Sequence, residues 1–321
     1  VINLDFDYDT YLRVIAEAGM QMTRVWSGYY RELNMTFGIL NNTLAPQPLR
    51  YAVPWVRSIE CCYFDGGNKF DLDEFEPEYF ARLKDFVAVA ASYDIIVNFG
   101  IFCRFYTDAL WGISPVNANN NDNDVENMNY TSVHTLTHKN MLAYQTKLVQ
   151  KLVTELNEFN NIFYEVINEP NQHDTVAWRD YMIQTIVDTE KSLPKKHLIS
   201  EVYGPYNKAT SIASTHYGKP SDNKANYDLN IALSNGETGF SGSENVAYRT
   251  QAYRWFISGG ATFDNLDYSF TAEHPDGTAC CPVVGPSGGG PELRKQLNIA
   301  KNLFMKLDLV NIYPMFNLSI V

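Results

Sequence analysis

The sequence predicts an α/β fold, a (β/α)8 TIM barrel whose first strand is truncated or incomplete. Helical stretches alternate with short apolar runs along the chain, the pattern of a parallel sheet with crossover helices. Several of these runs are nearly continuous, as expected for strands that are covered on both faces. The length of 321 residues suits one such barrel. We therefore expect a single catalytic domain over residues 1–321.

The predicted elements follow in order from the N-terminus. Helical periodicity with start and stop signals predicts helices over residues 9–18, 77–92, 139–159, 175–191, 248–258 and 292–307. Apolar runs between them predict strands over residues 22–26, 95–102, 162–167, 198–202, 212–216, 230–233 and 261–266. A closed barrel needs one more strand, for which residues 1–4 are the candidate. Because this run is short, we expect the chain to begin late in that strand.

Charge and composition restrict the function classes. The formal net charge of -12 disfavours contact with nucleic-acid phosphates or with anionic lipid surfaces. No apolar run approaches the roughly 20 residues that cross a bilayer. The 21 Tyr, 18 Phe and 5 Trp provide more flat faces than a core of this size requires. Sugar-binding clefts use such faces for stacking, although half-buried packing accommodates tyrosine equally well.

The five cysteines do not form a metal-binding pattern. Cys61 and Cys62 are adjacent, as are Cys280 and Cys281, and Cys103 lies in an apolar run. None has the spacing of a zinc site. The two adjacent pairs could cross-link in an oxidising compartment, but the odd count leaves one thiol over and the pairing cannot be deduced.

Two glutamates follow predicted strands. Glu169 comes after the strand at 162–167, and Glu237 comes after the run at 230–233 and a turn of small residues. Glycoside cleavage needs one carboxylic acid to protonate the leaving oxygen and one carboxylate to attack the anomeric carbon. Burial would raise the pKa of Glu169 and keep it protonated. Either residue alone could be a rim residue or an ion-pair partner, but together they predict an acid and a nucleophile on opposite sides of one cleft, where a separation of about 5 Å would mean retention.

Several motifs resemble those of the cellulase-type glycoside hydrolases of the retaining (β/α)8 clan, similar to glycoside hydrolase family 5. The strongest are YEVINEP at 164–170 and GETGF at 236–240. Further matching runs are TRVW at 23–26, GGNKFDL at 66–72, WGISP at 111–115 and NLDYSF at 265–270. In that clan the Asn-Glu pair ends the fourth strand and the second Glu ends the seventh. The resemblance therefore implies that Glu169 is the acid/base and Glu237 the nucleophile.

The same resemblance implies roles for further residues. Arg24 would support the nucleophile from below, Asn168 would bind the hydroxyl beside the reacting carbon, and His216 with Tyr217 would face the nucleophile. An ordinary buried ion pair for Arg24 and a core position for His216 remain open. Candidate faces for stacking on sugar, each equally compatible with ordinary packing, are Trp26, Trp111, Tyr203 and Tyr268.

Two strand ends depart from the clan pattern and leave the substrate open. The eighth strand ends in Asp267-Tyr268, where many members place a tryptophan platform. The third ends in Phe102-Cys103-Arg104, where a histidine or asparagine is common.

Other site classes have weaker support. His134 and His138 are four residues apart, but no carboxylate completes a known metalloenzyme pattern, so we expect no metal. The acidic residues between 122 and 126 lack the rest of a calcium loop. The Gly-rich run at 285–290 lacks the Lys-Ser/Thr of a phosphate loop, and no Gly-X-Ser-X-Gly elbow indicates an esterase.

The sequence thus predicts a retaining glycoside hydrolase that cleaves β-glycosidic bonds in a polysaccharide or oligosaccharide by double displacement, without a cofactor. The alternatives are a transglycosylase that uses the same site, a carbohydrate-binding barrel without turnover, and a metal-dependent barrel hydrolase. We expect no nucleic-acid or membrane partner, and the oligomeric state stays open. An extracellular or periplasmic location is expected from the substrate class alone.

Overall fold

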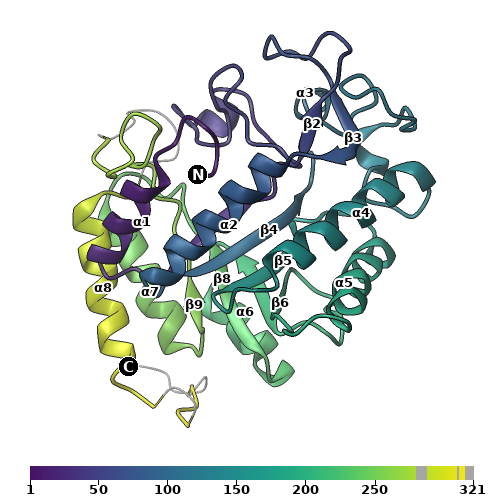
Figure 1. Cartoon of the computed structure of the whole chain (residues 1–321). Coiled ribbons are helices and arrows are strands. Elements are labelled where there is room, and N and C mark those ends of the chain that lie inside the picture. The colour runs from purple at the N-terminus through teal and green to yellow at the C-terminus, as the bar shows by residue number, and fades with distance from the viewer. Residues whose placement is uncertain (280–287, 309–310, 315–321) are drawn as a thin grey trace.

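A parallel β-sheet forms the centre of the molecule (Figure 1). The computed structural model describes residues 1–279, 288–308 and 311–314. Within this part of the chain the sheet has seven strands, ordered in space as they are in sequence. They are β1 (Met22–Trp26), β4 (Ile96–Cys103), β5 (Ile162–Asn168), β6 (Ile199–Val202), β7 (Ile212–His216), β8 (Ala232–Glu237) and β9 (Thr262–Phe263). The sheet curls as a barrel wall does, so the expected barrel is present in incomplete form.

The expected strand at residues 1–4 is not formed, and this prediction was wrong. The Leu4 backbone N–H donates to the Arg50 carbonyl at 2.8 Å, so the segment is bonded to a loop instead of the sheet. Among the described strands, β1 and β9 are consequently the two edges of the sheet.

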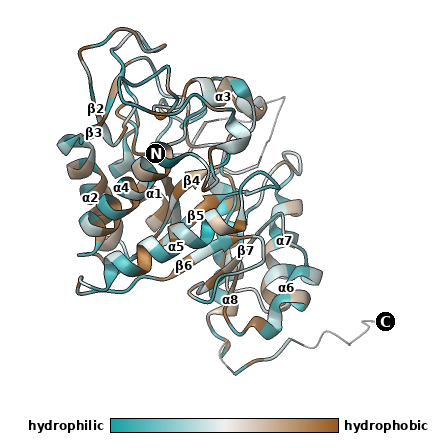
Figure 2. Ribbon diagram, turned by 90° about the vertical axis from the view of Figure 1, so that its right-hand side faces the viewer, coloured by the Kyte–Doolittle hydropathy of each residue, from teal (hydrophilic) through white to brown (hydrophobic). Residues whose placement is uncertain are grey.

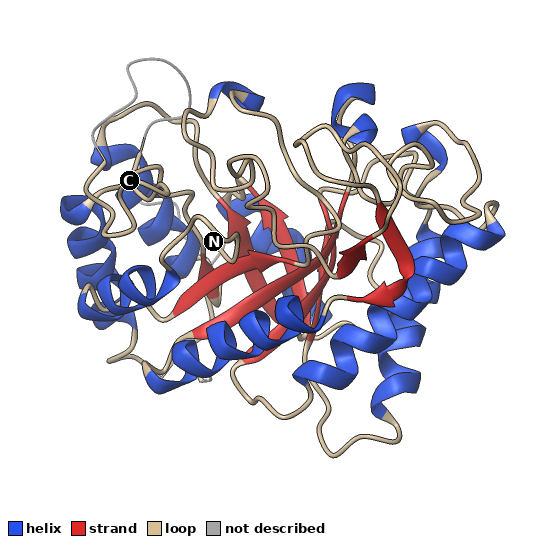
Figure 3. Ribbon diagram, turned by 45° about the horizontal axis from the view of Figure 1, so that its top comes forward, coloured by secondary structure: helices blue, strands red, loops and turns tan. Residues whose placement is uncertain are grey.

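Helices surround the sheet and loops gather at one end of it (Figure 3). The helices are α1 (Tyr8–Glu17), α2 (Pro77–Ser92), α3 (Asp108–Gly112), α4 (Lys139–Leu156), α5 (Val176–Glu190), α6 (Pro220–Asn226), α7 (Asn245–Ile257) and α8 (Pro291–Phe304). Residues that favour helix initiation lie at the start of several of these helices. In α2, for example, Pro77 occupies the first turn and the Glu76 side chain accepts from the Glu78 backbone N–H. Among the helices described, none is long and apolar enough to cross a membrane.

The core lies between the sheet and the helices. Every residue of β5 is buried, and so is every residue of β4 after the first. The brown colour of these two strands in Figure 2 reflects their near-continuous apolar sequence. Helix α4 turns Leu148, Leu152 and Leu156 toward this core. The two strands therefore carry the residues that follow them on a rigid support.

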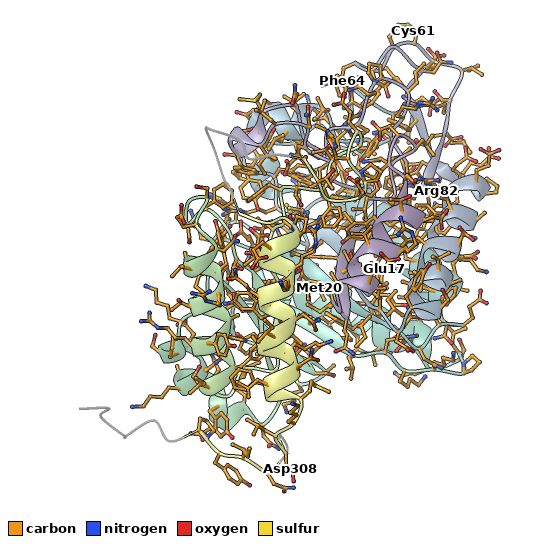
Figure 4. The ribbon with its side chains drawn as sticks, turned by 90° about the vertical axis from the view of Figure 1, so that its left-hand side faces the viewer. Glu17, Met20, Cys61, Phe64, Arg82 and Asp308 are labelled. Atoms are coloured by element: carbon orange, nitrogen blue, oxygen red, sulfur yellow. A yellow bond between two sulfur atoms is a disulfide. The ribbon has the colours of Figure 1, made fainter. Side chains whose placement is uncertain are left out.

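One antiparallel hairpin was not predicted. It consists of β2 (Trp55–Arg57) and β3 (Phe70–Phe75), outside the parallel sheet. The loop between them carries Cys61 and Cys62, which are bonded to each other and not to the second cysteine pair (Figure 4). Cys103 is a buried free thiol. Cys280, Cys281 and residues 285–287 of the Gly-rich run at 285–290 lie outside the described residues.

Candidate active site

Glu169 and Glu237 meet at the carboxyl end of the sheet. Glu169 directly follows β5, Glu237 is the last residue of β8, and both line a cavity of about 600 Å³. One oxygen of each carboxylate and a ring nitrogen of His216 all lie within 4.8 Å of one another. The chain therefore brings two carboxylates from distant strands to a separation at which both can act on one small group.

Two donors hold the Glu237 carboxylate. Arg24 Nη1 donates to Oε2 at 3.1 Å, and the Tyr217 hydroxyl donates to Oε1 at 2.7 Å. Gly236 allows this approach, because a Cβ at that position would lie 2.3 Å from Ser214 Oγ on the neighbouring strand. Both oxygens of Glu237 are thus held in place by hydrogen-bond donors.

Arg24 links three strands of the sheet. Its Nη2 donates to Asn168 Oδ1 at 2.6 Å and to Glu165, so the guanidinium joins β1 to β5 as well as to β8. Burial alone would lower the pKa of Arg24, but the charges of Glu165 and Glu237 raise it. The side chain is only 8% exposed, so this buried cation lies between two carboxylates and offsets part of their negative charge.

Glu169 has a different set of partners. His216 Nδ1 lies 3.0 Å from Oε1, the Tyr106 hydroxyl donates to Oε2 at 2.7 Å, and Arg104 Nη2 lies 3.8 Å from Oε2. Burial pushes the pKa up, but the bonds from His216 and Tyr106 and the Arg104 charge outweigh it and lower the pKa to about 2. The expected rise in the pKa of Glu169 was therefore wrong.

The backbone at Glu169 is left-handed, with φ of 45°. This conformation is uncommon for a residue with a side chain and concentrates at functional sites. It follows directly from β5, where Asn168 is the last residue in register with Cys103 of β4. The turn therefore redirects the chain as it leaves the sheet and sets the Glu169 side chain in the cavity.

Most of the other predicted residues lie at this site. Trp26 lines the cavity, with the Arg24 guanidinium 4.5 Å from its ring centre. The Asn168 amide nitrogen donates to the Tyr106 hydroxyl at 3.1 Å. Tyr268 lines the cavity beside Phe240, with ring centres 6.1 Å apart. Tyr203 is exposed and does not line the cavity, but its ring centre is 6.0 Å from that of His216.

Trp111 is not at the site, and its assignment as a sugar platform was wrong. The ring packs against Phe105 with centres 4.9 Å apart, and the indole N–H donates to the Met128 carbonyl at 3.0 Å. The side chain is buried and absent from the cavity lining. Trp111 thus belongs to the core.

Several residues of the site were missed. Glu165 had a signal, because a charged residue inside a fully buried strand calls for a partner. Tyr106, Glu32, Phe37 and Asp264 had no such signal, since loops and packing bring them to the cavity. Asp264 follows β9, and burial raises its pKa to about 7; the Arg24 charge opposes this rise, and the Glu237 and Glu165 charges add to it.

The predicted metal alternatives gain no support. His134 Nδ1 bonds to Asp174 at 2.7 Å, whereas His138 Nε2 lies 3.0 Å from Ser132 Oγ. Glu126 accepts the backbone N–H groups of Asn140 and Met141. Across the described part of the chain, the only group of three or more potential metal-binding side chains is Glu169, His216 and Glu237.

Comparisons with known proteins show the same fold. No family model matches the sequence, and no curated protein matches it. A structure from Bacteroides vulgatus, provisionally described as a glycoside hydrolase, aligns with a TM-score of 0.66 at 14% identity over 94% of this chain and 55% of the other. The chain thus spans about half the length of that protein.

Two further structures align over most of both chains. An endo-β-1,4-mannanase from Thermotoga petrophila has a TM-score of 0.57 at 12% identity, covering 94% of this chain and 75% of its own. A family 5 mannosidase from Rhizomucor miehei has a TM-score of 0.55 at 12% identity, covering 95% and 92%. The fold is therefore of the cellulase type, like that of glycoside hydrolase family 5.

Proposed function

We propose that this protein is a retaining glycoside hydrolase acting on β-linked oligosaccharides or polysaccharides. The observation that carries the proposal is the close approach of the Glu169 and Glu237 carboxylates in one cavity, with oxygens within 4.8 Å. Retaining enzymes place their two carboxyl groups about 5–5.5 Å apart, whereas inverting enzymes need about 6.5–9.5 Å to admit a water molecule. The fold shared with glycoside hydrolases supports the same conclusion.

In the first step, Glu237 attacks the anomeric carbon while the glycosidic bond breaks. Arg24 and Tyr217 donate to the two oxygens of Glu237 and hold the carboxylate in a fixed orientation. Glu169 gives its proton to the departing oxygen, and a covalent glycosyl-enzyme forms. In the second step, ionised Glu169 takes a proton from water, the water oxygen replaces Glu237 at the anomeric carbon, and the product retains its configuration.

The first step needs the acid form of Glu169. Burial raises the pKa of this carboxyl, but His216, Tyr106 and Arg104 together lower it to about 2. A bound sugar excludes water and disfavours two adjacent carboxylate charges. Substrate binding therefore favours the acid form of Glu169 in the complex.

Two of the proteins with the same fold are a mannanase and a mannosidase, so β-mannan is the first polymer to test. A transglycosylase would use the same covalent intermediate and would differ only in the acceptor that replaces water. An extracellular or periplasmic location is part of this proposal, because polymers of this kind are encountered outside the cytoplasm.

The test combines a substrate panel with chemical rescue. The parent protein is assayed on aryl β-glycosides and on mannan, β-glucan, xylan and galactan, beside Glu169→Ala and Glu237→Ala. We expect azide to restore Glu169→Ala with a β-glycosyl azide product and Glu237→Ala with the α anomer. A parent that binds a glycan without cleaving it would favour the non-catalytic barrel, and inverted product configuration would contradict the retaining mechanism.

A further inference from the structure

Glu32 is a buried carboxyl in the cavity that the proposed reaction does not use. It lies in the segment that follows β1 and folds over the carboxyl end of the sheet. The residue is 5% exposed and lines the same cavity as Glu169 and Glu237. Its backbone N–H donates to the Leu44 carbonyl at 2.9 Å, which fixes the position of the side chain.

Only neutral groups donate to this carboxyl. The Tyr30 hydroxyl donates to Oε1 at 3.0 Å, and the Asn42 amide donates to Oε2. Of the ion pairs formed by the described residues, none includes Glu32. A carboxylate offers about four acceptor positions, so two remain for another donor.

Glu32 lies close enough to Glu237 for the charge of that carboxylate to affect the Glu32 pKa. Burial raises its pKa to about 7; the bonds from Asn42 and Tyr30 oppose this rise, and the negative charge of Glu237 adds to it. A buried carboxyl beside another carboxylate costs free energy compared with a neutral amide of the same shape. A glutamine could hold the loop as well, so the bonds to Tyr30 and Asn42 do not by themselves explain a glutamate.

A sugar supplies the missing donor. Hydroxyl groups are the donors a neutral glycan carries, and a carboxylate is the strongest acceptor for them. Glu32 and Glu237 line the same cavity, and the charge of Glu237 acts on Glu32. In the proposed reaction Glu169 uses its own oxygens for the leaving group, so it is not free to bind a ring hydroxyl.

We propose that Glu32 determines specificity by accepting a hydrogen bond from one hydroxyl of the sugar ring bound over Glu237. The inference rests on the proposed hydrolase function and adds the group that selects the sugar. It assigns recognition of that ring to the segment after β1, and not to a tryptophan at the end of the last strand.

The test is a thermodynamic cycle between residue and substrate. The parent and Glu32→Gln are assayed on an aryl β-glycoside and on its monodeoxy analogues, one ring position at a time. For one position we expect the parent to lose roughly 10- to 100-fold in kcat/KM when the hydroxyl is removed. Glu32→Gln should lose a similar factor on the full substrate and little more on that analogue.

Controls separate contact from folding. Glu126→Gln is the matched control, because Glu126 also holds a loop through neutral donors but lies outside the cavity. Its loss of kcat/KM on each monodeoxy analogue should equal that of the parent. Glu32→Asp keeps the charge and is the second variant to use if Glu32→Gln disturbs folding. Its loss of kcat/KM on removal of that hydroxyl should lie between the losses of the parent and of Glu32→Gln. Equal losses by Glu32→Gln on the full substrate and on every analogue would overturn the inference alone. A parent that cleaves no glycoside would overturn the proposed function and this inference together.

Discussion

Arg24 Nη1 and Glu237 Oε2 are 3.1 Å apart, although 213 positions separate the two residues in the sequence. The contact runs from β1 to β8, and the same guanidinium bonds to β5. A single cation therefore ties the proposed nucleophile to the sheet and balances the buried charge of Glu165.

Loss of this cation should affect stability as well as activity. We expect Arg24→Ala to lower the free energy of unfolding by about 3–5 kcal/mol, because two carboxylates would lose their buried partner. Urea unfolding measures this change. Arg13→Ala is the control: its pair with Glu17 is exposed and should contribute less than about 0.5 kcal/mol. Equal effects of the two substitutions would contradict a central role for Arg24.

Tyr106 should set the pH range of the acid step. Its hydroxyl stabilises ionised Glu169, so Tyr106→Phe should raise the pKa of that carboxyl. The alkaline limb of kcat, which reports the enzyme with substrate bound, should then move to higher pH by about 1 unit, since more Glu169 stays protonated. Tyr144→Phe, which removes a hydroxyl bonded to the remote Asp73, should leave the profile in place. A shift to lower pH would have the wrong sign.

Asp264 should make stability depend on pH. Its pKa is about 7 in the folded protein and near 3.8 when unfolded, so the folded state binds more protons between these values. Stability should therefore fall as pH rises from 4 to 7. Asp264→Asn should flatten that fall and be more stable than the parent at pH 8 by about 1–2 kcal/mol.

Urea unfolding at several pH values tests this prediction. Asp73 should change stability with pH in the opposite direction. Its bond to Lys147 lowers its pKa, so its contribution to stability is lost as pH falls. A parent whose stability rises steadily from pH 4 to 8, with Asp264→Asn parallel to it, would exclude the proposed effect.

Two exposed rings at the cavity should bind sugar. Phe37 and Phe240 line it and are 45% and 46% exposed. We expect alanine at either position to raise KM on polymers by roughly 2- to 10-fold, in line with about 0.5–1.5 kcal/mol for an aromatic contact. The melting temperature should change little. Ile59→Ala is the control, since Ile59 is 92% exposed outside the cavity; no change in KM for either phenylalanine variant would remove them from the binding surface.

The sequence was sufficient for most of the fold because local patterns determine its elements. β1, β7 and α2 begin and end where predicted. β8 was placed two residues early, because Asn230 adopts a left-handed conformation that ends the preceding turn and the strand extends through the small residues up to Glu237.

The site was only partly predictable for a physical reason. Glu169 and Glu237 lie in local motifs, whereas Tyr106 and Glu32 reach the cavity through loop packing that no spacing records. The pKa of Glu169 illustrates the limit: burial can be inferred from a strand end, but the opposing bonds come from other segments of the chain.

The agreement between strand order in space and in sequence has a consequence for biosynthesis. Each parallel strand can join the one made before it as the chain leaves the ribosome, so the sheet can grow from β1 onward. Tyr106 and Glu169 would be in place while β8 is still being translated. The proposed nucleophile arrives late, and a nascent chain that ends before residue 237 would have most of the sheet and the proposed proton donor but would lack the second carboxylate.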